Sequence, residues 1–259
     1  KANISVSLRD VSPNYAIPAT ASLTQLSASD RRGVDFSISR EECDRWALMS
    51  HQRASKAETD GKFKNEIVSV PIAEGKSFEK DEHIRHDSSP EKLAKLKPVF
   101  GGVTTAGNAS GMNDAAAALV VADENYMKKW SQATGLKPLA KIVGVVQVGC
   151  DPRRMGIGPV SAIRKLSDEL RWEYAKLDYI EVNEAFAAQV LSVKKELKLS
   201  DEQLNPHGSG ISLGHPLGAT GARISSHIAH LISAGELKRA IGSACIGGGQ
   251  GIAVAFEAV

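Results

Sequence analysis

Three segments in the last third of the chain hold side chains that could carry out acyl transfer. VNEAF contains Asn183, GHPLGATGAR contains His215, and SACIGGGQG contains Cys245, followed closely by glycines that begin at Gly247. A cysteine with an unperturbed pKa of about 8.5 can exchange a proton near neutral pH. A histidine can donate to a developing oxyanion or activate a thiol, and bare glycine amides supply backbone N–H donors. Together these residue types fit acyl-transfer chemistry.

Each of these side chains also has a purely structural interpretation. Asn183 ends an expected strand directly before an expected helix, where an asparagine often serves as the cap. Cys245 could be a small buried apolar residue beside a hairpin turn. His215 stands in a loop between a glycine and a proline, so a core role fits it less well than a histidine on a helix face. His227 and His230 lie three apart on one expected helix, where surface or packing roles are expected.

A fourth loop, TAGNASG, places Ser110 between Gly107 and Gly111, so that a ligand could approach the backbone. Several familiar catalytic patterns are absent from the sequence. It contains no phosphate loop of the GxxxxGKS or GxxxxGKT type, no GxSxG nucleophile elbow and no HExxH zinc motif. GIGPVS lacks the third glycine of a dinucleotide fingerprint.

Composition excludes several classes of protein. The 259 residues are 42% hydrophobic, which allows a substantial core, and the net charge of +2 argues against nucleic acid as the main partner. No apolar run is long enough to span a bilayer. The three cysteines, Cys43, Cys150 and Cys245, have no zinc-like spacing and are odd in number, so we expect neither a metal site nor a disulfide framework. Reducing, intracellular surroundings fit this pattern. The chain begins with Lys1 and has no signal-peptide pattern, so we expect a processed chain or a piece of a larger one.

Strand and helix patterns alternate in residues 136–259. The expected strands are LAKIVGVVQVG, DYIEVNE, RAIGSACIG and GIAVAFEAV, and the expected helices are GPVSAIRKLSDEL, AFAAQVLSVKKEL and ARISSHIAHLIS. This alternation predicts an α/β fold with a largely parallel sheet, helices on both faces and an antiparallel pair at the end. Functional side chains collect at the carboxyl ends of such strands, which is where the three segments lie.

The first hundred residues are less regular. Ser39 and Glu42 have the capping-box spacing at the start of a helix that we expect to run to Gly61. KNEIVSVPI predicts a strand, and the charged segment that follows it is expected on the surface. Residues 105–135 predict a glycine-broken loop, a helix of alanines, a short apolar strand and a second helix over ENYMKKWSQATG.

Several long motifs resemble those of the thiolase family. They are NEAFA (183–187), GHPLGATGAR (214–223), SACIGGGQG (243–251), TAGNASGMND (105–114), MGIGP (155–159) and ISREECDRWALMSHQRA (38–54). The resemblance covers most of the chain from Ile38, and GCDPRRMGIGP and CIGGGQG are most similar to degradative 3-ketoacyl-CoA thiolases of the mitochondrial type. It implies a thiolase-like α/β fold with a five-stranded mixed sheet, helices on both faces and a partial loop domain.

The resemblance also implies an activity and a role for each residue. Thiolases cleave a 3-ketoacyl-CoA with free CoA to acetyl-CoA and a shortened acyl-CoA, or run the reverse condensation, through an acyl-cysteine. By resemblance, His215 activates that nucleophile and, with a water held by Asn183, binds the thioester oxygen. Cys245 is then the acid/base, and the Gly247 amide belongs to a second oxyanion hole. The residues implied to bind CoA or line its tunnel are Ser110, Ala109, Gly107, Ala185, Phe186, Met155 and Arg85. For Arg85, a solvated surface arginine is the alternative. Coenzyme A is a substrate in this scheme, and neither a permanently bound cofactor nor a metal is expected.

One departure from the family concerns the nucleophile, which lies in an amino-terminal half. Nothing in this chain resembles the opening strands of that half or its nucleophile segment. Cys43 falls on the expected helix, where a structural thiol is the better interpretation. We expect residues 1–101 to be a partial loop domain, 102–135 the last helix and strand of a mostly missing amino-terminal domain, and 136–259 the carboxyl-terminal domain. The isolated chain is therefore expected to be inactive. The alternative is a non-catalytic remnant that serves as a CoA-binding or oligomerisation module.

The expected partners are CoA thioesters and a second copy of the chain, in a homodimer or homotetramer, without nucleic acid or a membrane span. The resemblance places the protein in the mitochondrial matrix, with the cytoplasm or peroxisome as alternatives.

Overall fold

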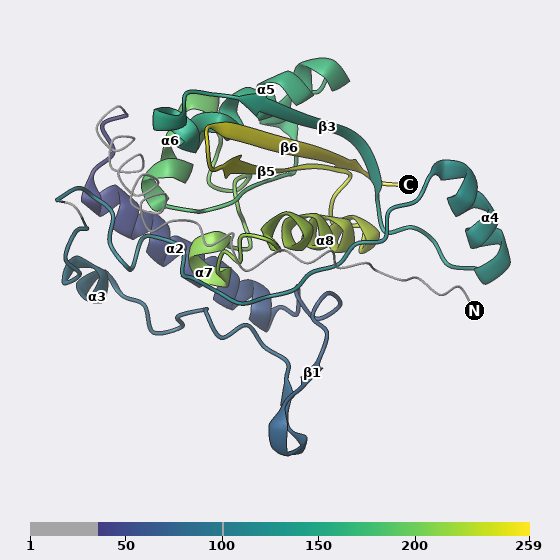
Figure 1. Ribbon diagram of the computed structural model, residues 1–259, viewed down its shortest axis with the longest axis horizontal. Helices are drawn as coiled ribbons and strands as arrows, with labels where there is room; N and C mark the ends of the chain where they lie inside the picture. Colours follow the sequence, from purple (N-terminus) through teal and green to yellow (C-terminus); the bar gives the residue numbers. More distant parts are fainter. Residues whose placement is uncertain (1–35, 100) are drawn as a thin grey trace.

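A mixed sheet forms the centre of the computed structural model, which describes residues 36–99 and 101–259. The sheet contains β3 (Lys141–Gly149), β4 (Tyr179–Val182), β5 (Arg239–Ile246) and β6 (Gln250–Glu257) in the order β3-β6-β5-β4 (Figure 1). The predicted α/β class is confirmed. Within the described residues the sheet has four strands, where five were expected. Only β4 and β5 are parallel, because the closing hairpin inserts β6 between β5 and β3.

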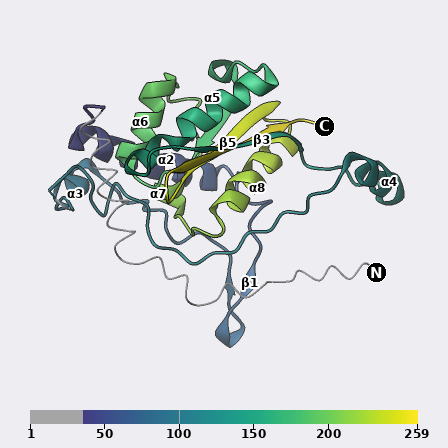
Figure 2. The ribbon, with the colours of Figure 1, turned by 45° about the horizontal axis from the view of Figure 1, so that its top comes forward.

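Helices cover both faces of this sheet. α5 (Gly158–Leu170) and α6 (Ala187–Leu197) lie on one side, and α8 (Thr220–Ser233) lies on the other (Figures 1 and 2). Each face has its own apolar cluster, with Ile163 in the first and Ile228 in the second. β4 buries all of its residues because both of its faces are covered. The burial continues past the end of β4 through Asn183, Glu184 and Ala185.

α2 (Arg40–Thr59) is the long helix of the first hundred residues, and its start agrees with the prediction. Ser39 accepts a hydrogen bond from the backbone of Glu42, whose side chain accepts one from the Ser39 backbone, so the capping box forms. The helix stops before Gly61, which has a φ of 73°. Cys43 is fully buried in the core, which agrees with a structural thiol. One face of α2 packs against α6 and against α7 (Gly210–Leu213).

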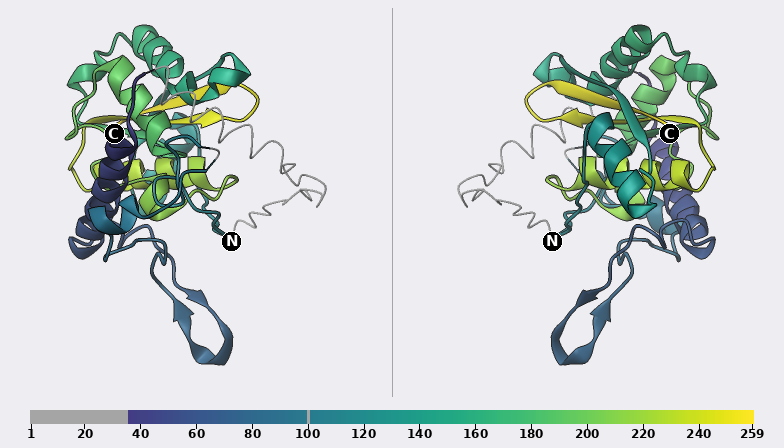
Figure 3. Two further views of the ribbon diagram at one scale, coloured as in Figure 1. Left: turned by 90° about the vertical axis from the view of Figure 1, so that its left-hand side faces the viewer. Right: turned by 90° about the vertical axis from the view of Figure 1, so that its right-hand side faces the viewer.

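The segment after α2 forms an arm rather than the predicted strand. Only Val70–Pro71 (β1) and Ser77–Phe78 (β2) pair, around η1 (Ala73–Gly75), and the arm projects from the body of the molecule (Figure 3). The remaining short helices are α3 (Pro90–Ala94), η2 (Pro152–Ile157) and η3 (Tyr174–Lys176). None of the described helices is long and apolar enough to cross a membrane.

Residues 112–123 differ most from the sequence prediction. They contain neither the alanine helix nor the short apolar strand, and Met112, Val120 and Val121 are exposed. A short run of alanines does not hold a helix in water without packing on one face. Within residues 36–99 and 101–259 the segment 114–123 is exposed throughout. α4 (Glu124–Thr134) follows it and buries no residue, so it stands away from the body (Figure 1).

Candidate active site

Asn183 is the first residue after β4. Its environment distinguishes a helix cap from a residue that holds a water or a ligand group. Its backbone N–H donates to Ser243 O at 2.9 Å, which prolongs the pairing with β5. Its side chain is fully buried, and neither the amide oxygen nor the amide nitrogen has a hydrogen-bond partner within the described part of the chain. α6 begins at Ala187 with Phe186 as its N-cap residue, so Asn183 does not cap it. A buried amide with both polar atoms free is costly, which indicates a site for water or a ligand group.

His215 reaches this region through α7. An ideal Cβ on Gly210 would lie 2.8 Å from Asn183 Oδ1, so the first residue of α7 rests directly on the Asn183 amide. The helix ends at Leu213, and Gly214, with a φ of 91°, turns the chain into His215. The His215 backbone N–H donates to Asn113 Oδ1 at 3.2 Å.

The hydrogen bonds of His215 indicate which ring nitrogen is basic. Nδ1 lies 2.7 Å from Thr220 Oγ1, and that hydroxyl donates to Pro216 O at 2.9 Å. When the hydroxyl proton goes to Pro216 O, Nδ1 carries the proton of the shared bond and Nε2 keeps its lone pair. Burial, assisted by the positive charge of Arg223, lowers the pKa of His215 to about 4. The imidazole is therefore neutral at physiological pH and can accept a proton at Nε2.

Cys245 occupies the next-to-last position of β5 and is half-buried. β4 and β5 run parallel with Val182 opposite Ser243, so Asn183 and Cys245 leave the sheet at the same end. Burial raises the pKa of the Cys245 thiol to about 12, with a smaller contribution from Cys150. The thiol is protonated at neutral pH, as a proton donor to a carbanion must be.

The glycines after Cys245 have different reasons for being glycine. Gly248 and Gly249 have φ values of 86° and 93°, which side chains rarely adopt. A Cβ on Gly249 would also lie closer than 3.0 Å to the Cys150 carbonyl, and the Cys150 N–H donates to Gly249 O at 2.7 Å. Gly251 lies backbone to backbone against Gly158 at the start of α5. Gly247 is exposed and does not have a positive φ.

Gly251→Ala is expected to lower the free energy of unfolding by several kcal/mol, because overpacking against a fixed backbone costs about 1–3 kcal/mol or more. Its Cβ would lie closer than 3.0 Å to backbone atoms of Gly158. Urea unfolding followed by circular dichroism measures the effect. The control is Gly218→Ala, since a Cβ there meets nothing within 4 Å. Equal midpoints for the two variants would contradict this account of the contact.

The loops expected to hold CoA lie side by side. Ala109 and Phe186 form an isolated antiparallel bridge, and Ser110 donates to Ala185 O from its backbone at 3.0 Å and from its hydroxyl at 3.1 Å. The structure thus brings four of the predicted binding residues together. Gly107 has another explanation.

A Cβ on Gly107 would lie closer than 3.0 Å to the side chains of Leu93 and Leu96, so packing accounts for the glycine. Met155 is buried in η2, on the side of the sheet that α6 covers. Arg85 is exposed, and its backbone N–H donates to His51 Nδ1 at 3.2 Å.

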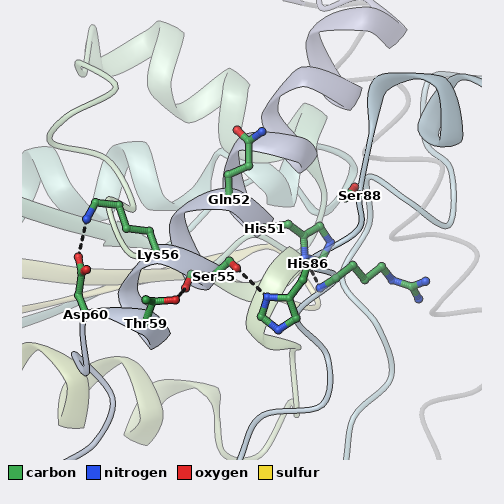
Figure 4. Close-up of a pocket in the computed structure, with 9 residues that line it drawn as sticks. His51, Gln52, Ser55, Lys56, Thr59, Asp60, His86 and Ser88 are labelled. Atoms are coloured by element: carbon green, nitrogen blue, oxygen red, sulfur yellow. Dashed lines mark hydrogen bonds and ion pairs between the residues drawn. The ribbon is translucent and has the colours of Figure 1, made fainter.

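One pocket of the described residues is separate from these loops. It has a volume of about 410 Å³ and is lined by His51, Gln52, Ser55, Lys56, Thr59, Asp60, Arg85, His86 and Ser88 (Figure 4). Lys56 is paired with Asp60 at 2.6 Å, and Ser55 Oγ lies 2.6 Å from His86 Nδ1. The polar groups of this pocket are therefore largely engaged with one another. Of the predicted site residues, only Arg85 lines it.

Two buried polar groups were missed by the sequence analysis. The Glu184 carboxylate is fully buried beside Asn183, and Glu181 on β4 forms a buried ion pair with Arg223. Neither has a local sequence signal, because the donors to both carboxylates include residues in distant segments. His227 is buried, with Nδ1 2.7 Å from Glu66 Oε1, so of its two expected roles the packing role is correct. No group of metal-ligating side chains is present in the part of the chain that the structure describes.

The stability of the fold is expected to rise with pH between about 4 and 6.5. Burial lowers the pKa values of His51, His207 and His215 to about 4 each. An unfolded histidine titrates near 6.5, so the unfolded chain binds more protons in this window, and stability is lost as pH falls through it. Urea midpoints measured from pH 4.5 to 7.5 test this. His51→Gln should flatten the pH dependence, and an unchanged slope in that variant would contradict the assignment to His51.

Comparison with known proteins decides the family. The family model for the thiolase C-terminal domain matches residues 136–258, and the model for the thiolase N-terminal domain matches residues 9–125. The chain belongs to the thiolase family. The amino-terminal match begins at residue 9, upstream of Ile38, which is the first residue of the thiolase-like motifs.

Individual thiolases are similar over most of the chain. Beta-ketothiolase BktB of Cupriavidus necator is 47% identical over 232 residues, which are 87% of this chain and 58% of that protein. The mitochondrial 3-ketoacyl-CoA thiolase of Bos taurus is 47% identical over 234 residues, covering 88% of this chain and 58% of its own. The chain thus spans less than two thirds of the length of these curated relatives.

Solved thiolase structures share the fold. Human mitochondrial 3-ketoacyl-CoA thiolase in complex with CoA superimposes with a TM-score of 0.83 at 41% identity, covering 91% of this chain and 59% of that one. The Bacillus anthracis acetyl-CoA acetyltransferase gives a TM-score of 0.86 at 45% identity, covering 91% and 60%.

Proposed function

We propose that this chain supplies the proton-transfer and oxyanion-binding part of a thiolase site that acts on 3-ketoacyl-CoA and acetyl-CoA. The buried amide of Asn183, which has no hydrogen-bond partner among residues 36–99 and 101–259, carries the proposal. It is adjacent to the helix that leads to His215 and lies at the sheet end that holds Cys245. The CoA complex of a solved relative and the acyltransferase names of the curated relatives support CoA thioesters as substrates.

The proposed chemistry assigns one proton to each group. In thiolysis, the Cys245 thiol gives its proton to the carbanion of the departing acetyl-CoA, and in condensation the thiolate removes the same proton. His215 Nε2 takes the proton of the attacking thiol. A water held by Asn183 then donates to the thioester oxygen. The Gly247 amide stabilises the tetrahedral intermediate. Ser110 and Ala109 contact the pantetheine arm, and Ala185, Phe186 and Met155 line the tunnel. Arg85 is the candidate for the nucleotide end of CoA.

The nucleophilic cysteine is proposed to lie outside this chain. Cys43 is fully buried in the apolar core, and Cys245 is assigned to proton transfer. Cys150 is held by the turn of Gly249, and burial raises its pKa, which disfavours the thiolate. The proposal includes the domain boundaries near residues 101 and 135, a homodimer or homotetramer, and the mitochondrial matrix as the compartment.

A partial reaction tests this function without the nucleophile. In D2O, the chain is expected to accelerate deuterium incorporation into the methyl group of acetyl-CoA, by about 10²-fold to 10⁴-fold for a positioned acid/base. Proton NMR of the thioester methyl measures the rate, and calorimetric titration with CoA measures binding in the same preparation. Binding without exchange would support a non-catalytic CoA-binding module. Absence of both would reject the proposed site.

A further inference from the structure

The carboxylate of Glu184 is fully buried, and both of its oxygens are occupied. Oε1 accepts hydrogen bonds from Trp46 Nε1 at 2.9 Å and Asn205 Nδ2 at 3.0 Å. Oε2 accepts from Ser50 Oγ at 2.6 Å and from the Ile211 N–H at 3.3 Å. A buried carboxylate is tolerated only when donors replace its water, and here four do so. None of these donors is a lysine or an arginine.

The donors to Glu184 come from the parts of the fold that surround the site. Trp46 and Ser50 are on α2, and Ile211 is in α7, which leads directly to Gly214 and His215. Asn205 belongs to a loop and has a φ of 51°. Its side chain also accepts from the Val182 N–H and donates to Val182 O, both at 2.8 Å, as a neighbouring strand would. The carboxylate therefore joins the end of β4 to two helices and this loop.

α7 is fastened to the Asn183–Glu184 turn at several points. An ideal Cβ on Gly210 would be 2.8 Å from Asn183 Oδ1 and 2.8 Å from Glu184 O, so the helix cannot approach further. The bond from the Ile211 N–H to Glu184 prevents it from moving away. Ser50 Oγ, which donates to the carboxylate, also lies 2.8 Å from Ser212 Oγ.

We propose that Glu184 is a positioning residue, whose carboxylate fixes the distance between the Asn183 amide and His215 by holding α7 against the turn that follows β4. This role rests on the proposed function, in which Asn183 and His215 act on one thioester. A displacement of about 1 Å in such a pair can cost on the order of a hundredfold in rate.

Glu184→Gln in the 259-residue chain tests the proposal, because the side chain keeps its shape but turns one acceptor into a donor that faces other donors. Hydrogen–deuterium exchange is measured for the amides of residues 211–216, and the His215 imidazole is titrated by NMR. Amide exchange is expected to be about tenfold faster or more, as for the loss of a hydrogen bond to a charged group. The pKa of His215 should rise from about 4 because the loosened loop admits water.

Trp46→Phe is the matched control. It removes one donor to Oε1, where the Asn205 donor remains, and leaves the Oε2 bonds to Ser50 and Ile211 in place. It should leave the exchange of residues 211–216 and the pKa of His215 unchanged. Ser50→Ala removes a donor to Oε2, so it should also speed the exchange of residues 211–216 and raise the pKa of His215. It replaces Glu184→Gln as the test if that variant does not fold.

Equal effects in Trp46→Phe and Glu184→Gln, or no change in Glu184→Gln, would show that the carboxylate only stabilises the fold. Exchange on acetyl-CoA is followed in the same variants, with a larger expected loss in kcat than change in KM. If the unmodified chain has no such activity, the proposed function fails, whereas the amide exchange and the titration still decide the role of Glu184.

Discussion

Cys245→Ala is expected to abolish the exchange of acetyl-CoA methyl protons, with a loss of about 10²-fold to 10⁴-fold that matches the contribution of a positioned acid/base. Cys245 as a residue is half-buried and lies at the end of β5, directly before the exposed turn that begins at Gly247. Because burial raises its pKa to about 12, the thiolate is a minor species at neutral pH. The catalysed rate should therefore rise about tenfold per pH unit up to at least pH 10. Buffer-catalysed exchange is subtracted at each pH.

The control for this variant is Cys150→Ser, which removes the neighbouring half-buried thiol. It should change the exchange rate little, since the Cys150 thiol makes only a smaller contribution to the raised pKa of Cys245. If Cys245→Ala exchanges as fast as the unmodified chain, another base carries the reaction and the assignment of Cys245 is wrong.

Thiolysis of acetoacetyl-CoA by the 259-residue chain alone is expected to be absent. Acyl transfer needs an activated nucleophile within reach of its base, and the three cysteines of the chain are a core residue, a thiol of raised pKa in a turn, and the proposed acid/base. The missing segment can be supplied from a relative, as the amino-terminal part of that protein to which this chain does not align. Its addition or co-expression should restore turnover. Loss of substrate absorbance with and without that segment measures the difference.

Glu184 and Cys245 variants of the restored enzyme test whether turnover depends on the proposed site. Cys245→Ala should again remove turnover. Robust thiolysis by the chain alone, after removal of any full-length enzyme, would mean that one of its own cysteines is the nucleophile. Serine substitution at Cys43, Cys150 and Cys245 in turn would then identify it.

Local signals in the sequence predicted the elements that depend on local chemistry. α2 starts at its capping box and stops at Gly61, and α5 and α8 lie where the apolar periodicity places them. Strand order was not predictable in the same way. Only tertiary pairing places β6 between β5 and β3, so the sheet is less parallel than strand–helix alternation suggests.

Motifs predicted which loops matter, but not how the loops are held. The segment of Ala109 and Ser110 lies beside that of Ala185 and Phe186, as the resemblance implied. Glu184 looks like an ordinary polar residue in the sequence. Its importance comes from distant donors, since Ser50 precedes it by 134 residues and Trp46 by 138. The alanine helix expected near residue 115 failed for the opposite reason, since local propensity was present and a packing surface was not.

Asn113 joins two regions with different packing. Its side chain accepts the His215 N–H and fills the space beside Gly214, while the residues that follow it are exposed and irregular. The Asn113 side chain therefore links the exposed segment to the residues that hold the imidazole, so a substitution that displaces the one is expected to displace the other.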